Sequence, residues 1–82
     1  MTKMTAMKAD QVLDVRGLSC PLPVLKANRA MASIPAGGTL EVIATDPNAP
    51  DDFEAFCATM RHTLLASEDA DGTYRFLIRK AG

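Results

Sequence analysis

The fold is decided by one stretch, QVLDVRGLSCPLPVLKANRAM (residues 11–31), in which a strand pattern runs through a glycine turn into a helix start. Three apolar residues within Gln11–Val15 predict a short strand. An amphipathic helix is predicted from Pro21 to about Ser33. The N–H groups of a first helical turn have no partner within the helix, so prolines are tolerated there. Pro21 and Pro23 therefore mark the point where the helix begins.

The rest of the chain continues this alternation of strand and helix. After the turn IPAGG, a strand rich in β-branched residues is predicted at Thr39–Thr45, and a second helix from Asp51 to about Leu64. Two further strands are predicted at Leu65–Ala70 and Thr73–Arg79. The first two strands should be parallel, and the last two should form a hairpin at Asp71-Gly72.

The order β-α-β-α-β-β predicts an α+β fold. We expect a two-layer α/β sandwich, in which a mixed four-stranded sheet carries two helices on one face. The run TLEVIAT is apolar almost throughout, which favours a central position in the sheet. Residues 1–10 are predicted to form a flexible N-terminal tail, and residues 11–82 a single domain.

The composition narrows the classes of function. The chain has 82 residues and a net charge of −1, whereas a dedicated nucleic-acid binder is strongly basic, so we expect no direct contact with nucleic acid. No apolar run approaches the roughly 20 residues of a membrane span, and no secretory signal is recognised, so we expect no membrane association. Two cysteines are too few for a disulfide framework, which indicates a cytoplasmic protein.

Cys20 is the candidate reactive residue. If Cys20 is the N-cap of the first helix, Pro21 is the first helical residue and Pro23 the third; Ser19 is the alternative cap. A helix N-terminus stabilises an anion, so the sequence predicts an exposed thiol with a lowered pKa. The alternative is a structural cysteine that serves only as a small apolar side chain or as a cap. Gly17 can supply an unusual backbone angle just upstream.

The remaining candidates for chemistry are less promising. Cys57 lies in the middle of the apolar face predicted for the second helix, and we expect it to be buried and inert; the face comprises Phe53, Phe56, Cys57, Met60 and Leu64. His62 lies off that face and is predicted to point to solvent, which leaves Cys20 without a base. No spacing of cysteine and histidine indicates a metal site. A thiol without acid–base partners, metal or cofactor fits a carrier of sulfur better than a classical enzyme.

The segment LDVRGLSCPLPVLKA resembles the signature of the TusA family of sulfur-carrier proteins, also called SirA-like. The signature is a CPxP motif, here residues 20–23, after a short strand and a lead-in that includes Asp14. The motif is supported by Gly17, Leu18, Pro21 and Pro23. The segments PAGGTLEVIATDP and FCATMRHTLLASEDADGTYRFLIRKAG are also similar to the family, so the resemblance covers nearly everything from Leu13 to the C-terminus.

This resemblance implies a persulfide carried on Cys20 and no cofactor. The donor would be a cysteine desulfurase or a rhodanese-like protein, and the acceptor another protein, in tRNA 2-thiouridine synthesis, molybdenum-cofactor synthesis or sulfur oxidation. Some relatives have an acidic residue where this chain has Leu22, which puts the particular pathway in doubt. The candidate docking residues are Leu22, Lys26, Arg29 and Asp46, and a monomer is expected.

Two alternatives stay open. The first is a module that handles selenium or thiosulfate sulfur, which would need the same cysteine. The second is a non-catalytic regulatory domain in which Cys20 is only a cap. A small thiol hydrolase or peroxidase ranks below both, because the chain offers no base for Cys20.

Overall fold

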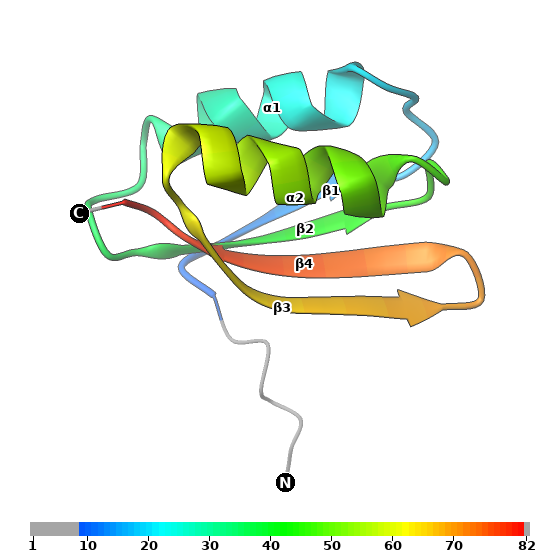
Figure 1. Ribbon diagram of the computed structural model, residues 1–82. Helices are drawn as coiled ribbons and strands as arrows, with labels where there is room; N and C mark the ends of the chain where they lie inside the picture. Colours follow the sequence, from blue (N-terminus) through cyan, green and yellow to red (C-terminus); the bar gives the residue numbers. More distant parts are fainter. Residues whose placement is uncertain (1–8, 82) are drawn as a thin grey trace, which may run out of the picture.

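Six elements follow one another in the predicted order, and both helices cover the same face of one four-stranded sheet (Figure 1). The structure, a computed structural model, describes residues 9–81. Its elements are β1 (Gln11–Val15), α1 (Leu22–Met31), β2 (Thr39–Ala44), α2 (Ala49–Met60), β3 (Thr63–Ala70) and β4 (Thr73–Arg79). The predicted fold class is confirmed.

The strand order in the sheet is β1-β2-β4-β3. β1 and β2 are parallel, with Val15 opposite Ala44, whereas β4 is antiparallel to both of its neighbours. The prediction of a central second strand is confirmed, because β2 lies between β1 and β4. Parallel strands end at the same edge of a sheet, so the loops that follow β1 and β2 emerge side by side. These two loops build the candidate site.

The core lies between the sheet and the two helices. Val42 of β2 and Phe76 of β4 are fully buried on the sheet side, and Ala27 and Phe53 are fully buried on α1 and α2. The rings of Phe53 and Phe76 stack with their centroids 4.8 Å apart. Burial of apolar surface in this layer is the main stabilising contribution, and it fixes both helices against the sheet.

The second helix ends four residues earlier than the sequence predicts. Arg61 has a φ of 62° and caps α2 in the left-handed conformation, and the N–H of His62 donates to the carbonyl oxygen of Cys57 at 2.9 Å. Thr63 then begins β3, so Leu64 belongs to a strand, not to the helix. Met60, assigned to the buried face, is 44% exposed, because this final turn lies at the end of the helix.

The predicted flexible tail falls largely on residues 1–8, which lie outside the described residues. Asp10, assigned to that tail, is held at the start of β2. Its N–H donates to the carbonyl oxygen of Thr39 at 3.1 Å, and its carboxylate accepts the N–H of Thr39 at 2.9 Å. Asp10 is therefore fixed against β2, just before β1 begins.

Candidate functional site

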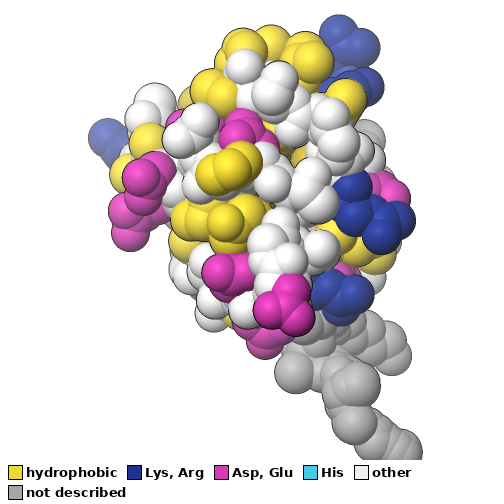
Figure 2. All heavy atoms as spheres, turned by 90° about the vertical axis from the view of Figure 1, so that its right-hand side faces the viewer, with side chains coloured by type: hydrophobic (Ala, Val, Ile, Leu, Met, Phe, Trp, Pro, Cys, Tyr) yellow, Lys and Arg dark blue, Asp and Glu magenta, His cyan; other side chains and the backbone are white. Residues whose placement is uncertain are grey.

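Cys20 lies in the loop between β1 and α1, at the end of the sheet where the two parallel strands finish. Its side chain is exposed, as the sequence predicts. Figure 2 faces this end of the molecule and shows hydrophobic side chains gathered near its centre, with acidic side chains close beside them. This end of the molecule therefore presents both apolar and acidic side chains.

Cys20 is not the cap of α1, nor is Ser19. The N-cap is Pro21, with φ −98° and ψ 12°, so Pro23 is the second helical residue and not the third. The helical hydrogen-bond pattern begins here, where the N–H of Leu25 donates to the carbonyl oxygen of Pro21 at 3.1 Å. Cys20 therefore lies one residue outside the helix, where the dipole of α1 acts on it less directly.

The turn before Cys20 is fixed by backbone hydrogen bonds. Gly17 has a φ of +82°, a region that favours glycine, and its N–H donates to the Thr45 hydroxyl at 2.9 Å. The N–H of Leu18 donates to the carbonyl oxygen of Val15 at 3.2 Å, and its side chain packs against the core. The two lead-in residues thus connect the Cys20 loop to β1 and to the end of β2.

Asp46 holds the same loop from the other side. Its Oδ2 accepts the N–H of Cys20 at 2.6 Å, and its Oδ1 accepts the N–H of Asn48 at 3.1 Å. The residue is only 8% exposed. Its carboxylate is thus directed at the backbone of its own chain, and the docking role of Asp46 stays a prediction.

The electrostatics of Cys20 are the reverse of the sequence prediction. The pKa of the Cys20 thiol is raised, first by its hydrogen bond to the Asp52 carboxylate, then by desolvation and by the negative charges of Asp52 and Asp46. Asp52 lies in the first turn of α2. Sequence reasoning missed this contact, although the pair of aspartates at the predicted start of the second helix was a visible signal.

The other two candidates lie elsewhere. Cys57 is 3% exposed, which confirms its predicted burial, and burial raises its pKa to about 11; its inertness stays a prediction. His62 is not fully solvated: its ring lies 5.4 Å from that of Phe56, and its Nδ1 accepts the N–H of Ala81 at 3.0 Å. Because His62 follows the far end of α2, a helix roughly 18 Å long, it is too distant to act as a base for Cys20.

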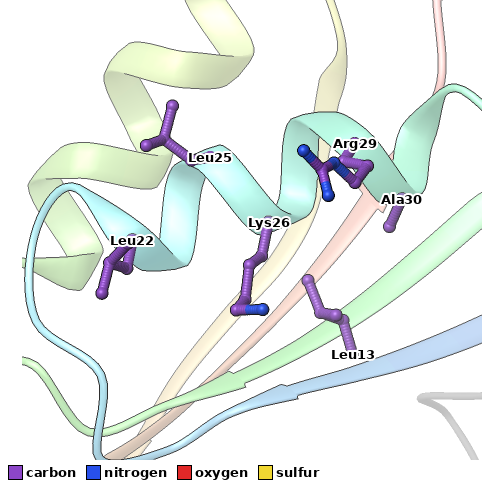
Figure 3. Close-up of a pocket in the computed structure, with 6 residues that line it drawn as sticks. All are labelled: Leu13, Leu22, Leu25, Lys26, Arg29 and Ala30. Atoms are coloured by element: carbon purple, nitrogen blue, oxygen red, sulfur yellow. The ribbon is translucent and has the colours of Figure 1, made fainter.

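Three of the four predicted docking residues come together in one groove, between α1 and the edge strand β1 (Figure 3). The groove has a volume of about 420 Å³ and is lined by Leu13, Leu22, Leu25, Lys26, Arg29 and Ala30. Lys26 reaches from α1 toward the sheet, and Leu13 points up from β1 (Figure 3). Leu22 and Leu25 are 45% and 57% exposed, so the groove presents apolar surface beside two cations.

Within residues 9–81, no three side chains of His, Cys, Asp or Glu are arranged to hold a metal ion. None of the described helices is long and apolar enough to cross a membrane. The candidate site therefore consists of one exposed thiol, two carboxylates and an adjacent groove.

Comparison with known proteins gives consistent matches. Residues 11–80 match a family model described as "Sulfurtransferase TusA". A Neisseria meningitidis protein whose name assigns it as a sulfur carrier is 46% identical over 84% of this chain and 93% of its own. The sulfur carrier protein TusA of Allochromatium vinosum is 43% identical over 88% of this chain and 95% of its own. A SirA-like protein from Desulfitobacterium hafniense has the same fold, with a TM-score of 0.76, 23% identity and coverage of 88% and 99%.

Proposed function

The chain belongs to the TusA family of sulfur carriers, and from this premise we propose that it accepts one sulfane sulfur on Cys20 and passes it to an acceptor protein. The observation that carries the proposal is the contrast between its two cysteines. Cys20 is exposed on a loop tied to both parallel strands, whereas Cys57 is buried. A single accessible thiol on a rigid loop suits exchange between proteins, whose rate depends on thiolate character, the leaving group and access.

The chemistry needs no cofactor. The thiolate of Cys20 attacks the terminal sulfur of a donor persulfide; the donor's S–S bond breaks, a new S–S bond forms on Cys20, and the donor leaves as a thiolate. The Cys20 proton passes to water or to the Asp52 carboxylate, the group with the largest effect on the pKa of the thiol, and the donor thiolate takes up a proton in its place. The acceptor thiolate then attacks the Cys20 persulfide in the same way, so no net oxidant or reductant is consumed.

The partners follow from this chemistry. The donor is a protein that presents a persulfide, a cysteine desulfurase or a rhodanese-like protein, and the acceptor is a protein that serves tRNA thiolation, molybdenum-cofactor synthesis or sulfur oxidation. Two free cysteines support a reducing cytoplasm as the place where the carrier acts. The net charge of −1 supports a relay through proteins without direct contact with nucleic acid.

The groove between α1 and β1 is the proposed docking surface for these partners. Neither Lys26 nor Arg29 makes an ion pair among the described residues. A partner segment with acidic residues and an apolar anchor matches both the cations and the exposed leucines. Beside Cys20, Asp52 supplies negative charge. Cations in the groove and a carboxylate beside the thiol would fix the orientation in which a partner docks.

The function is tested by intact mass after incubation with a cysteine desulfurase and cysteine. Wild-type protein and Cys57→Ala should gain one sulfur atom, and Cys20→Ser should gain none. Fragment masses should place the added sulfur on Cys20. Two results together would favour a non-catalytic regulatory domain. The wild-type protein would gain no sulfur from any persulfide donor, and the Cys20→Ser protein would still support the cellular function of the wild type.

The docking surface is tested by the dependence of sulfur transfer on donor concentration. Lys26→Glu and Arg29→Glu should each raise the KM for the donor about tenfold and leave the rate at saturation unchanged. Arg79→Glu is the matched control, because Arg79 is an exposed cation at the C-terminal end of β4, outside the groove. Equal KM values for the groove variants and the control would exclude the groove as the docking surface.

A further inference from the structure

Asp46 is one of two charged residues that are buried in the described part of the chain, and it is held unlike the other. Glu41 is paired with Arg75 at 3.5 Å, whereas no cation of residues 9–81 lies within ion-pair distance of Asp46. A buried carboxylate costs free energy unless hydrogen bonds compensate for the lost hydration. Among the described residues, the side chain of Asp46 is compensated by two backbone N–H groups, and one of them belongs to Cys20.

The geometry connects two parts of the site through one side chain. The distance of 2.6 Å from Oδ2 to the N atom of Cys20 is that of a short, charge-assisted hydrogen bond. The other carboxylate oxygen accepts the N–H of Asn48, the N-cap of α2, and the Asp46 carbonyl oxygen accepts the N–H of Ala49 at 2.9 Å. Asp46 thus joins the Cys20 loop to the start of α2, from a position just after β2.

We propose that Asp46 is a positioning residue for sulfur transfer, which holds the backbone of Cys20 so that the sulfur meets the donor persulfide in a fixed direction. The inference rests on the proposed function of Cys20, and it adds a role for a residue that neither donates nor accepts sulfur. A transfer between two proteins is sensitive to such positioning, because a misplacement of about 1 Å can cost roughly a hundredfold in rate.

The Asp46 carboxylate also affects the reactivity of Cys20, and this effect opposes the gain from positioning. The charged groups that act on Cys20 are Asp52 from α2 and Asp46 from the loop before it, and both raise the pKa of the thiol. Removing the charge of Asp46 should therefore make Cys20 more reactive toward a small alkylating reagent at neutral pH. Loss of positioning should make it slower toward a protein donor. A change of opposite sign in the two reactions distinguishes positioning from general damage to the site.

The experiment compares three variants of the full chain. Asp46→Ala removes both hydrogen bonds, Asp46→Asn retains one carbonyl acceptor, and Asp51→Asn is the matched control. Asp51 is exposed in the first turn of α2, and within residues 9–81 its side chain makes no hydrogen bond to the Cys20 loop, which Asp46 holds. The measurements are sulfur transfer at saturating desulfurase, the pH profile of alkylation by iodoacetamide, and hydrogen exchange of the Cys20 amide.

Asp46→Ala should lower the saturating transfer rate between about tenfold and a hundredfold, with the KM for the donor unchanged. It should also move the alkylation profile to lower pH and speed exchange of the Cys20 amide. Asp46→Asn should give an intermediate loss of transfer with a similar shift of the alkylation profile, and Asp51→Asn should match the wild type in all three measurements.

A raised KM with an unchanged saturating rate would overturn the inference and return Asp46 to a docking role. Unchanged exchange of the Cys20 amide in Asp46→Ala would also overturn it, because the hydrogen bond would then not hold the loop. If wild-type protein gains no sulfur, the proposed function fails, and the exchange and alkylation measurements still decide whether Asp46 positions Cys20.

Discussion

Replacing each cysteine in turn should separate stability from sulfur transfer. Cys57 is 3% exposed, on the face of α2 that packs against the sheet, so Cys57→Ala leaves a small cavity. Loss of burial and the cavity together cost about 1–2 kcal/mol, and the better helix propensity of alanine returns a few tenths. The expected net loss is about 1 kcal/mol, or roughly 4–8 °C in Tm for a domain of this size.

Cys20→Ser should do the reverse. Cys20 is exposed and lies outside α1, so its sulfur contributes no core packing, and a serine hydroxyl can keep the hydrogen bond to Asp52. Stability should stay at the wild-type value, and transfer should vanish, because a persulfide cannot form on oxygen.

The assay is denaturant unfolding of both variants, followed by transfer of labelled sulfur from a desulfurase per folded molecule. Cys57→Ala should transfer at the wild-type rate. If Cys57→Ala stays folded and loses transfer, the protein works through a pair of cysteines, and the single-thiol mechanism is refuted.

Three further changes test the fold and the loop. Burial and the charge of Lys80 lower the pKa of His62, so the folded protein favours the neutral ring. The stability that this preference contributes is present above the ordinary histidine pKa of 6.5. It is lost as the pH falls through the lower pKa that His62 has in the folded protein. Denaturant midpoints between about pH 7.5 and pH 5 should therefore fall less for His62→Gln than for wild type, and parallel curves would contradict this. Gly17→Ala should cost roughly 1–2 kcal/mol in unfolding free energy from backbone strain alone, because an added Cβ would meet no atom within 4 Å; an unchanged midpoint would refute the strain. Pro23→Ala should stay folded but lose on the order of 1 kcal/mol of unfolding free energy, because the buried ring is removed and the unfolded chain becomes less restricted. Its sulfur transfer should slow; a wild-type transfer rate would show that Pro23 does not position the thiol.

The elements were predictable where their patterns are local. The apolar strands, the hairpin at Asp71-Gly72 and the prolines that mark the start of α1 each depend on a few neighbouring residues. The end of α2 was not predictable, because Leu64 continues the helical spacing of Cys57 and Met60, so the same residues fit a longer helix. Only the left-handed Arg61 reveals the end, and sequence spacing does not show a backbone angle.

The candidate site, too, was predictable only where its residues are neighbours in the sequence. Cys20 and its glycine and proline neighbours lie together in the sequence and were identified from it. Asp46 and Asp52 come close to Cys20 only because β1 and β2 are parallel and end at one edge, where their loops meet. The thiol pKa depends on this meeting of distant segments, so its direction could not be worked out from the helix start alone.

The burial of Cys57 has a consequence for oxidative damage. A peroxide converts an accessible thiolate to a sulfenic acid, which a neighbouring thiol normally captures as a disulfide before further oxidation. The chain has only two cysteines, and the second is enclosed in the core, so it offers Cys20 no resolving thiol of its own. Repair must come from a thiol on another molecule. The two carboxylates beside Cys20 raise the pKa of its thiol, so they disfavour the thiolate, the form that a peroxide oxidises first.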